Sequence, residues 1–502
     1  MEKVSKELRD KYIPTIGLEI HMEQNTKTKM FCSCKNDPDA KPNEHTCPVC
    51  LGHPGTLPVI NKQACYNIVK LGLALGCDIP KVASFDRKNY FYPDLPKAYQ
   101  ITQLFEPFCL NGSLPICLSD DEVKLIELER IHQEEDTGKS LHTNVKTSTL
   151  LDYNRAGVPL MELVTKPVLH NGKDVKNFGE TLQLLLRTLN ISDANMEKGQ
   201  MRIEVNLSII EKTLENEGKL GTKVEVKNIN SFRAAEKAVE YEINRQILAL
   251  ENDEKIIQET RGWDDVNEKT VSQRTKEGSA DYRYFPDPDL PEIKVHSTDD
   301  SLFNLDDIKA TLPELPWELR KRLEGEYSLK GIKAVLFLNN KPLLDFFEKV
   351  VSELLSLSDK PKEEVINISY NYITSTLSGI LTKNNLTIEE INLPTNHFAI
   401  LLNYVLKDEI SSNSAKKVIE IMIETKKDPE EIINENNLKQ VVDMSAIESI
   451  VDTILKNNKK AVEEYKQGKE NSIQFLMGMV MKESKGTANP QIVIKMLKDK
   501  LN

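Results

Sequence analysis

Two pairs of closely spaced cysteines near the N-terminus constrain the fold of this chain more than any other feature. Cys32 and Cys34 form a C-x-C pair, and Cys47 and Cys50 form a C-x-x-C pair after 12 intervening residues. A short loop brings two such pairs together as four thiolates around one tetrahedral zinc ion. The alternative is four free thiols without a metal. The remaining four of the eight cysteines are scattered, which is typical of a reducing compartment rather than of a disulfide framework.

Length and composition indicate an ordinary soluble protein of several domains. The 502 residues correspond to about three domains. A hydrophobic content of 39% with 29% charged residues is enough for a sizeable core. No run of 18 apolar residues predicts a membrane span, and the acidic N-terminus lacks a signal sequence, so we expect a cytoplasmic location. The net charge of −12 indicates that any contact with nucleic acid is local or shared with partner chains.

The sequence predicts an α+β chain of three parts. Residues 1–295 contain short β-type runs and two segments of helical periodicity, 175–189 and 234–250, which predict a mixed-sheet domain. Residues 296–409 predict a helical domain, and residues 410–502 predict a small helical tail. Within the tail, apolar residues surround the segment 475–482 almost completely, which predicts a buried helix. The tract 430–437 reads as a linker or a helix junction.

Carboxylate and imidazole side chains recur on the predicted strands. Glu19 and His21 are two residues apart on a strand, so both project from the same face. Glu162 lies in an apolar run, where a buried carboxylate is costly unless it is paired or bound to a metal. Further acids in similar settings are Glu134, Glu135 and Glu204. Carboxylates with one histidine suit magnesium or manganese that binds substrate phosphates. The alternative is that these acids pair with nearby Arg and Lys.

Neither a phosphate loop nor a dinucleotide loop is present in the sequence, so a nucleotide must be held by metal and basic side chains. Candidates for ATP binding are Arg87, Lys88, Lys227 and Asn228. The aromatic residues Tyr90, Tyr92 and Tyr99 can stack on a terminal nucleotide, although packing at a domain seam is the alternative for each ring. No nucleophile motif for hydrolysing glutamine is found.

Several long motifs resemble the B subunit of the glutamyl/aspartyl-tRNA amidotransferase family. They are Ile16-Gly-Leu-Glu-Ile-His21, the ten residues from Phe85 to Asp94, Glu134-Glu-Asp-Thr-Gly-Lys139, the segments beginning at Asp152 and Asp281, and Lys485-Gly-Thr-Ala-Asn-Pro490. The likeness covers essentially the whole chain, in order. It implies a cradle-shaped catalytic domain, a helical domain and a tail similar to the small YqeY proteins.

The resemblance also implies an activity. ATP phosphorylates the side-chain carboxylate of misacylated Glu-tRNA(Gln) or Asp-tRNA(Asn), and ammonia from a separate amidase (glutaminase) partner, the A chain of the family, then forms the amide. A small third partner, the C chain, completes a heterotrimer. The sequence leaves open which of the two tRNAs is used. It also leaves two other hypotheses: a non-catalytic, zinc-stabilised protein that presents tRNA, and a stand-alone metal-dependent hydrolase.

The resemblance implies roles for individual residues as well. It carries magnesium ligation onto Glu19, His21, Glu135 and Glu162, with Glu134 as a substitute for its neighbour. The family usually has Asp where this chain has Glu204. Residues 410–502 contain 15 Lys against 14 Asp and Glu. The alternative for these lysines is a set of solvated helix faces, but the resemblance favours contact between the tail lysines, including Lys482 and Lys485, and tRNA phosphates.

Overall fold

The computed structural model describes residues 4–119, 122–142, 148–275, 282–298, 300–439, 444–467, 469, 471–484 and 490–501. It divides into two compact units, Met1–Lys321 and Arg322–Asn502. All strands of the described residues lie in the first unit, and the second unit is helical. The predicted α+β class is therefore confirmed.

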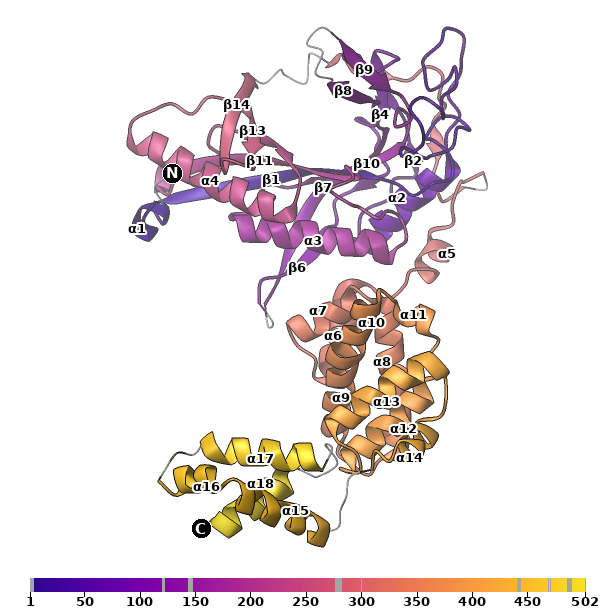
Figure 1. Cartoon of the computed structure of the whole chain (residues 1–502). Helices are drawn as coiled ribbons and strands as arrows, with labels where there is room; N and C mark the ends of the chain where they lie inside the picture. The colour runs from indigo at the N-terminus through magenta and orange to yellow at the C-terminus, as the bar shows by residue number, and fades with distance from the viewer. Residues whose placement is uncertain are drawn as a thin grey trace. The chain divides into compact units, whose positions relative to one another are not determined.

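One large sheet organises the first unit (Figure 1). Its strands pair antiparallel except where β12 runs parallel to β13. In spatial order they are β14 (Lys269–Thr275), β13 (Glu259–Asp264), β12 (Val224–Ile229), β11 (Met201–Glu211), β1 (Tyr12–Glu23), β10 (Pro159–Thr165), β7 (Val123–Glu135) and β5 (Cys109–Leu110), while β6 (Ser113–Cys117) also pairs with β7. The long strands β1 and β7 bring distant segments of the sequence into adjacent positions.

Helices cover one face of this sheet. Figure 1 shows α3 (Gly172–Thr188) and α4 (Phe232–Glu251) lying side by side along it, in agreement with the two helices predicted from periodicity. Asn171 and Ser231 cap their first turns through side-chain oxygens. Along β1, Leu18, Ile20 and Met22 point into the core between the sheet and these helices. The alternate residues of the strand therefore point to the opposite face.

Smaller sheets and helices complete the first unit. β15 (Phe285–Pro286) pairs with β3 (Asp86–Asn89), which pairs with β4 (Tyr99–Thr102). Two further pairs are β2 (Val82–Ala83) with β16 (Ile293–Lys294) and β8 (Lys139–His142) with β9 (Thr149–Asp152). The helices are α1 (Lys6–Arg9), α2 (Lys62–Ala74), a 3-10 turn at Leu214–Asn216, and α5 (Leu305–Ala310); the boundary between the two units falls within the next helix, α6 (Pro316–Tyr327). The pairing of β15 with β3 joins two of the motifs singled out from the sequence.

The second unit begins with a group of helices around buried aliphatic and aromatic residues. These are α7 (Ile332–Leu338), α8 (Lys341–Leu357), α9 (Lys362–Asn371), a π-helical turn (Tyr372–Leu377), α10 (Ser378–Asn384), α11 (Ile388–Ile391), α12 (Thr395–Leu406), α13 (Ser412–Thr425) and α14 (Pro429–Glu435). Helices α13 and α14 pack on α12. The tract 430–437, expected as a linker or junction, is mostly helix α14, because Asp428 caps it and Ile432 and Ile433 are buried.

The last four helices have a hydrophobic core of their own. They are α15 (Met444–Asn457), α16 (Lys459–Lys466), α17 (Asn471–Glu483) and α18 (Pro490–Leu501). The prediction of a fully buried helix at 475–482 is wrong: Leu476 and Val480 are buried, but Phe475 is 54% exposed. Helix α17 packs against α15 and α18 mainly with the face that carries Leu476 and Val480, so the other apolar residues of this helix remain near the surface. Among the described helices, none combines the length and the apolar character that crossing a membrane requires.

Candidate active site

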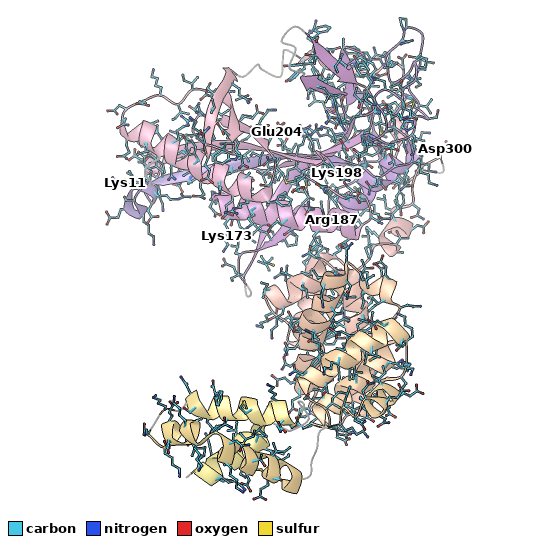
Figure 2. All side chains as sticks on the ribbon, viewed as in Figure 1. Lys11, Lys173, Arg187, Lys198, Glu204 and Asp300 are labelled. Atoms are coloured by element: carbon cyan, nitrogen blue, oxygen red, sulfur yellow. The ribbon has the colours of Figure 1, made fainter. Side chains whose placement is uncertain are left out.

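Four charged or titratable residues form a row across the central strands, on the sheet face opposite to α3 and α4. Strand register places Arg202 of β11 beside His21 of β1, His21 beside Glu162 of β10, and Glu162 beside His132 of β7. Figure 2 shows Glu204 over the same face, whereas Lys173 and Arg187 lie on α3 beneath the sheet. Because side chains alternate along each strand, the strand register places these charged and titratable side chains together on one face of the sheet.

His21, Glu134 and Glu162 make the tightest cluster on this face. The Nε2 atom of His21 lies 3.2 Å from Oε2 of Glu162 and 3.4 Å from Oε1 of Glu134. One ligand atom from each residue lies within 4.8 Å of the others, which is close enough for one shared metal ion. His132 adds a second imidazole, with Nε2 at 3.4 Å from Glu162 Oε2. The prediction that Glu162 is buried on a central strand is confirmed.

Burial and mutual proximity shift the pKa values of this cluster in different directions. Burial alone lowers the pKa of His21, but Glu162, Glu134 and Glu204 raise it to about 9. Burial favours the neutral form of Glu162, yet the imidazoles of His132 and His21 hold the pKa of this carboxyl well below its usual range. Burial and the neighbouring Glu162 raise the pKa of Glu134. A surplus of acidic groups thus surrounds His21, as expected of a site for a cation.

Glu19 belongs to a second acidic group on the same face, together with Glu204 and Glu225. Asn206 donates a hydrogen bond to Oε1 of Glu19 at 2.7 Å. The Lys227 ammonium lies 2.6 Å from Oε2 of Glu204 and 3.8 Å from Oε1 of Glu225. Lys227, expected to contact phosphate, therefore supplies the positive charge that this acidic group requires. Asn228 adopts a left-handed backbone conformation and donates to the Trp263 carbonyl.

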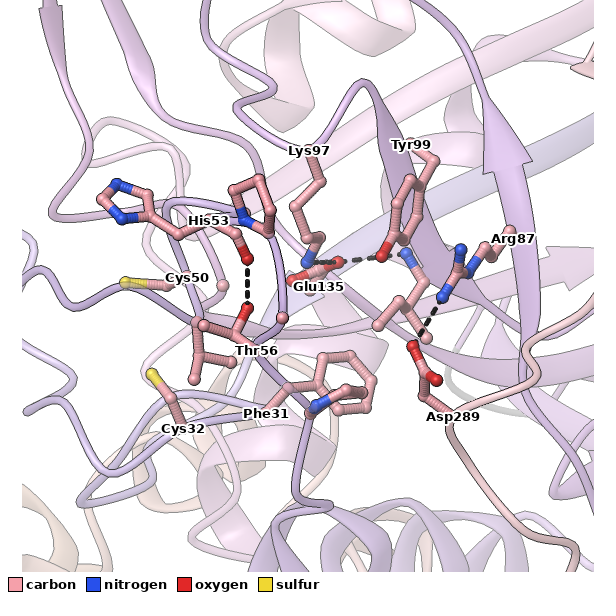
Figure 3. Close-up of a pocket in the computed structure, with 17 residues that line it drawn as sticks. Phe31, Cys32, Cys50, His53, Thr56, Arg87, Lys97, Tyr99, Glu135 and Asp289 are labelled. Atoms are coloured by element: carbon pink, nitrogen blue, oxygen red, sulfur yellow. Dashed lines mark hydrogen bonds and ion pairs between the residues drawn. The ribbon is translucent and has the colours of Figure 1, made fainter.

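Glu135 points to the opposite side of β7 from Glu134. Its Oε1 accepts the backbone N–H of Ile101 at 3.0 Å and forms an ion pair with Lys97. It lines a pocket of about 240 Å³ beside the cysteine segment (Figure 3), where Tyr99 and Arg87 also lie. The structure therefore does not bring Glu135 together with Glu19, His21 and Glu162.

The other basic candidates differ in how far they are paired. Arg87 is held by Asp287 at 2.8 Å and Asp289 at 2.9 Å, and its guanidinium lies over the Tyr99 ring. Lys88 faces the acidic cluster: burial lowers its pKa, but Glu134, Tyr284 and Glu162 raise it above its usual value. Within the described residues the Lys88 ammonium makes no side-chain hydrogen bond.

Tyrosine rings surround the Lys88 ammonium instead. Its Nζ lies 5.0 Å from the centroid of the Tyr282 ring and 5.8 Å from that of Tyr90. The Tyr90 hydroxyl donates to Gln100 at 3.1 Å. Tyr92 is exposed, whereas Tyr99 packs beneath Arg87. Among the three tyrosines expected to stack on a nucleotide, Tyr92 is therefore the most accessible.

The four cysteines of the opening motif converge as their spacing predicts. The sulfur atoms of Cys32, Cys34, Cys47 and Cys50 lie within 4.8 Å of one another. A hydrogen bond from Cys32, together with the Cys47 amide and the Lys29 ammonium, lowers the pKa of Cys50 to about 5. Lys29 is fully buried, with Nζ at 3.8 Å from Cys50 Sγ and 3.1 Å from the Tyr153 carbonyl. Four soft sulfur donors with a stabilised thiolate suit zinc.

Sequence reasoning missed three residues that the structure places in or beside the site, namely His132, Glu225 and Arg202, and it also missed Lys97, which pairs with Glu135 on the other side of β7. His132 and Arg202 were detectable in principle, since each is two residues from a named acid on the same strand. Lys97 was not, because only the tertiary fold brings it to Glu135. In the tail, Lys482 lies in the last turn of α17, and Lys485 lies outside the described residues.

Comparison with known proteins shows the family. Residues 14–299 match the GatB/GatE catalytic domain, and residues 345–501 match the GatB domain. A protein of Ruminiclostridium cellulolyticum, named as the B subunit of an aspartyl/glutamyl-tRNA(Asn/Gln) amidotransferase, is 44% identical over 98% of each chain. Two further proteins have the same name. The one from Clostridium tetani is 42% identical over 97% of this chain and 98% of that one. The one from Caldicellulosiruptor bescii is 43% identical over 98% of this chain and 99% of that one. The chain belongs to the GatB family.

Proposed function

We propose that this chain is the B subunit of a tRNA-dependent amidotransferase, a ligase that forms carbon–nitrogen bonds on misacylated tRNA. Relatives that match it from end to end are named as the B subunit of an aspartyl/glutamyl-tRNA(Asn/Gln) amidotransferase. The observation that carries the proposal is the buried His21–Glu134–Glu162 cluster beside the Lys88 ammonium. A protein that only presented tRNA would have no need to bury such a cluster.

The reaction that we propose has two steps. The side-chain carboxylate of Glu-tRNA(Gln) or Asp-tRNA(Asn) first takes the terminal phosphoryl group of ATP, with release of ADP. Ammonia then attacks the acyl phosphate and displaces phosphate, which leaves the amide. Because a carboxylate is a poor acyl donor to ammonia, the first step supplies the leaving group. Lys88, close to the acids and without a side-chain hydrogen bond within the described chain, is suited to contact the anionic phosphates.

The donor set fits a divalent cation such as magnesium or manganese. His21, Glu134 and Glu162 would hold it, and Glu19 with Glu204 extends the acidic surface beside it. His132 Nδ1 is buried without a hydrogen-bond partner among the described residues, so this nitrogen can still form a hydrogen bond with a group bound in the site. When bound, such an ion would neutralise charge on the phosphates. The chain's own residues orient the substrates: Tyr92 and Tyr90 offer rings for a terminal nucleotide, and Lys88 offers a fixed positive charge.

The zinc site, the partners and the tail complete the proposal. Cys32, Cys34, Cys47 and Cys50 would hold a structural zinc, because four cysteine ligands leave no open position for substrate. Ammonia would come from the amidase (glutaminase) A chain, with the small C chain in a heterotrimer that works in the cytoplasm. The lysines of the tail, including Lys482, would meet the tRNA backbone. The three-part division at residues 295 and 409 also stays a prediction.

Reconstitution tests the proposed function. The chain is co-expressed with candidate amidase and small partner chains, and the purified complex is given misacylated Glu-tRNA(Gln) or Asp-tRNA(Asn), ATP and magnesium. We expect ADP formation that depends on the misacylated tRNA, and amide formation that depends on glutamine or added ammonia. ATP cleavage that ignores the tRNA, or activity of the isolated chain on an unrelated ester or amide, would contradict the proposal.

A further inference from the structure

Arg202 stands directly beside the proposed metal cluster, yet it is not part of it. Register pairs it with His21 across β11 and β1, and both side chains point to the same face of the sheet. Its side chain is 36% exposed, whereas the carboxylate of Asp136, its partner, is almost fully buried. The guanidinium is therefore fixed at one end and accessible at the other.

The hydrogen bonds of Arg202 leave most of its donors available. One Nη2–H is donated to Asp136 Oδ2 at 2.9 Å. In the part of the chain that the structure describes, this is the only side-chain hydrogen bond that Arg202 makes. A guanidinium has five N–H donors, so several remain for a substrate.

Arg155 provides a contrast, because it shares Asp136 but has a structural role. Its Nε lies 3.7 Å from Asp136 Oδ2. Its Nε and Nη2 donate to the backbone carbonyls of Thr137 and Gly138 at 3.0 and 2.8 Å. Arg155 thus stabilises the turn after β7 through these hydrogen bonds and fixes the position of Asp136. Asp136 in turn sets the position of Arg202.

Among the described residues, none of the basic side chains that the sequence predicts to contact phosphate lies on the β11 side of the cluster with its charge available. Arg87 is neutralised by Asp287 and Asp289, and Lys227 by Glu204 and Glu225. Lys88 approaches the cluster from β3, on the side of Glu134. Arg202 approaches from β11, on the other side of His21. A phosphoryl group at the cluster would lie between these two cations.

We propose that Arg202 is a phosphate-binding catalytic residue, whose guanidinium contacts the phosphoryl group as it passes from ATP to the side-chain carboxylate. This inference rests on the proposed function. In the step, the bond between the γ-phosphorus and the β–γ bridging oxygen breaks, a bond from γ-phosphorus to a carboxylate oxygen forms, and ADP leaves. Arg202 donates hydrogen bonds to the non-bridging oxygens and transfers no proton. Planar guanidinium groups match phosphate in geometry and charge, and they stabilise charge that spreads over these oxygens. Asp136 is a positioning residue.

The test uses the complex of this chain with its partner chains and compares Arg202→Gln and Arg202→Lys with Arg187→Gln. Arg187 lies on α3, beneath the sheet and away from the site, so its variant should behave as wild type. For Arg202→Gln we expect kcat for tRNA-dependent ADP formation to fall about 100-fold or more, the usual loss when one preorganised donor is removed. Affinities for Mn²⁺ and for tRNA should be little changed. Arg202→Lys should recover only part of the rate, because an ammonium cannot form the paired hydrogen bonds.

Chemical rescue separates a catalytic role from a structural one. Free guanidinium added at low millimolar concentration should restore part of the activity of Arg202→Gly and leave wild type unchanged. Asp136→Asn should lower kcat less than Arg202→Gln does. The inference is overturned if Arg202→Gln keeps the wild-type kcat, if its loss of rate is matched by a loss of Mn²⁺ binding, or if free guanidinium does not rescue Arg202→Gly. If the wild-type complex itself shows no tRNA-dependent ADP formation, the proposed function fails instead.

Discussion

Glu134 and Glu135 are neighbours in sequence, but the structure gives them different environments, and exchanging each for glutamine tests which one belongs to the metal site. The Glu134 carboxylate lies 3.4 Å from His21 Nε2 and accepts a hydrogen bond from Thr102 at 3.1 Å. Glu135 faces Lys97 on the other side of β7. Glu134→Gln should therefore abolish tRNA-dependent phosphorylation, whereas Glu135→Gln should leave metal binding in place.

The expected magnitude follows from the distances. Opposite unit charges 3.4 Å apart attract each other by about 5 kcal/mol at an effective dielectric constant of about 20. The attraction between the Glu134 carboxylate and a divalent ion, which Glu134→Gln removes, would be larger because the ion carries two charges. Desolvation offsets part of this. Since changes outside the ligand shell already weaken metal binding by about 10–100-fold, loss of a ligand carboxylate should weaken Mn²⁺ binding by at least about 100-fold.

Electron paramagnetic resonance of free Mn²⁺ measures this affinity directly in both variants. Circular dichroism melting checks that each variant is folded, and Glu135→Gln serves as the matched control because it removes the same charge one residue away. The reasoning would be refuted by unchanged Mn²⁺ affinity in Glu134→Gln, and refuted more sharply if Glu135→Gln alone lost the metal.

Three further predictions concern other parts of the chain. Cys34→Ser should remove most of the zinc and lower the melting temperature, while tRNA-dependent ADP formation at low temperature persists; elemental analysis and thermal melts check this, and a zinc-free wild type would contradict it. Metal binding requires a neutral imidazole, and the pKa of His21 is about 9, so Mn²⁺ binding near pH 7 should release about one proton. For the same reason, Mn²⁺ affinity should increase by up to about tenfold for each unit by which the pH rises, until the pH reaches about 9. Calorimetry in two buffers measures the proton release, and the same release from His21→Gln would contradict the assignment. Truncation after residue 439 removes α15–α18, which have their own core, and should weaken tRNA binding and reduce its salt dependence; filter binding at several salt concentrations that gives equal slopes for both lengths would count against it.

Much of the site was predictable because strand alternation is a local property. Glu19 and His21 share a face as their spacing requires, and the spacing of the cysteine pairs brings four sulfur atoms together. Local patterns also predicted α3 and α4, whose apolar periodicity and cap residues agree. These features depend on residues close together in the sequence, so no knowledge of the tertiary fold was needed.

Pairing between distant segments was not predictable. Whether Arg87 and Lys227 are available for phosphate depends on acids that lie far away in the sequence or on the next strand, Asp287 and Glu204. Only the pairing of β15 with β3 and of β12 with β11 sets these contacts. A basic residue in a motif shows that positive charge is present, but its partners decide whether that charge remains for a substrate.

Strand β7 shows how one residue of register separates two functions. Its last two residues, Glu134 and Glu135, project to opposite faces, one toward His21 and the other toward Lys97. A slip of one residue would exchange them and would also remove His132 from Glu162. The apolar residues Ile126, Leu128 and Ile131 oppose such a slip, because all three are fully buried in the core beneath the sheet. Packing on the helix side of the sheet therefore determines which carboxylate meets the metal on the other side. Core substitutions in β7 should accordingly affect metal binding although none of these residues touches the site.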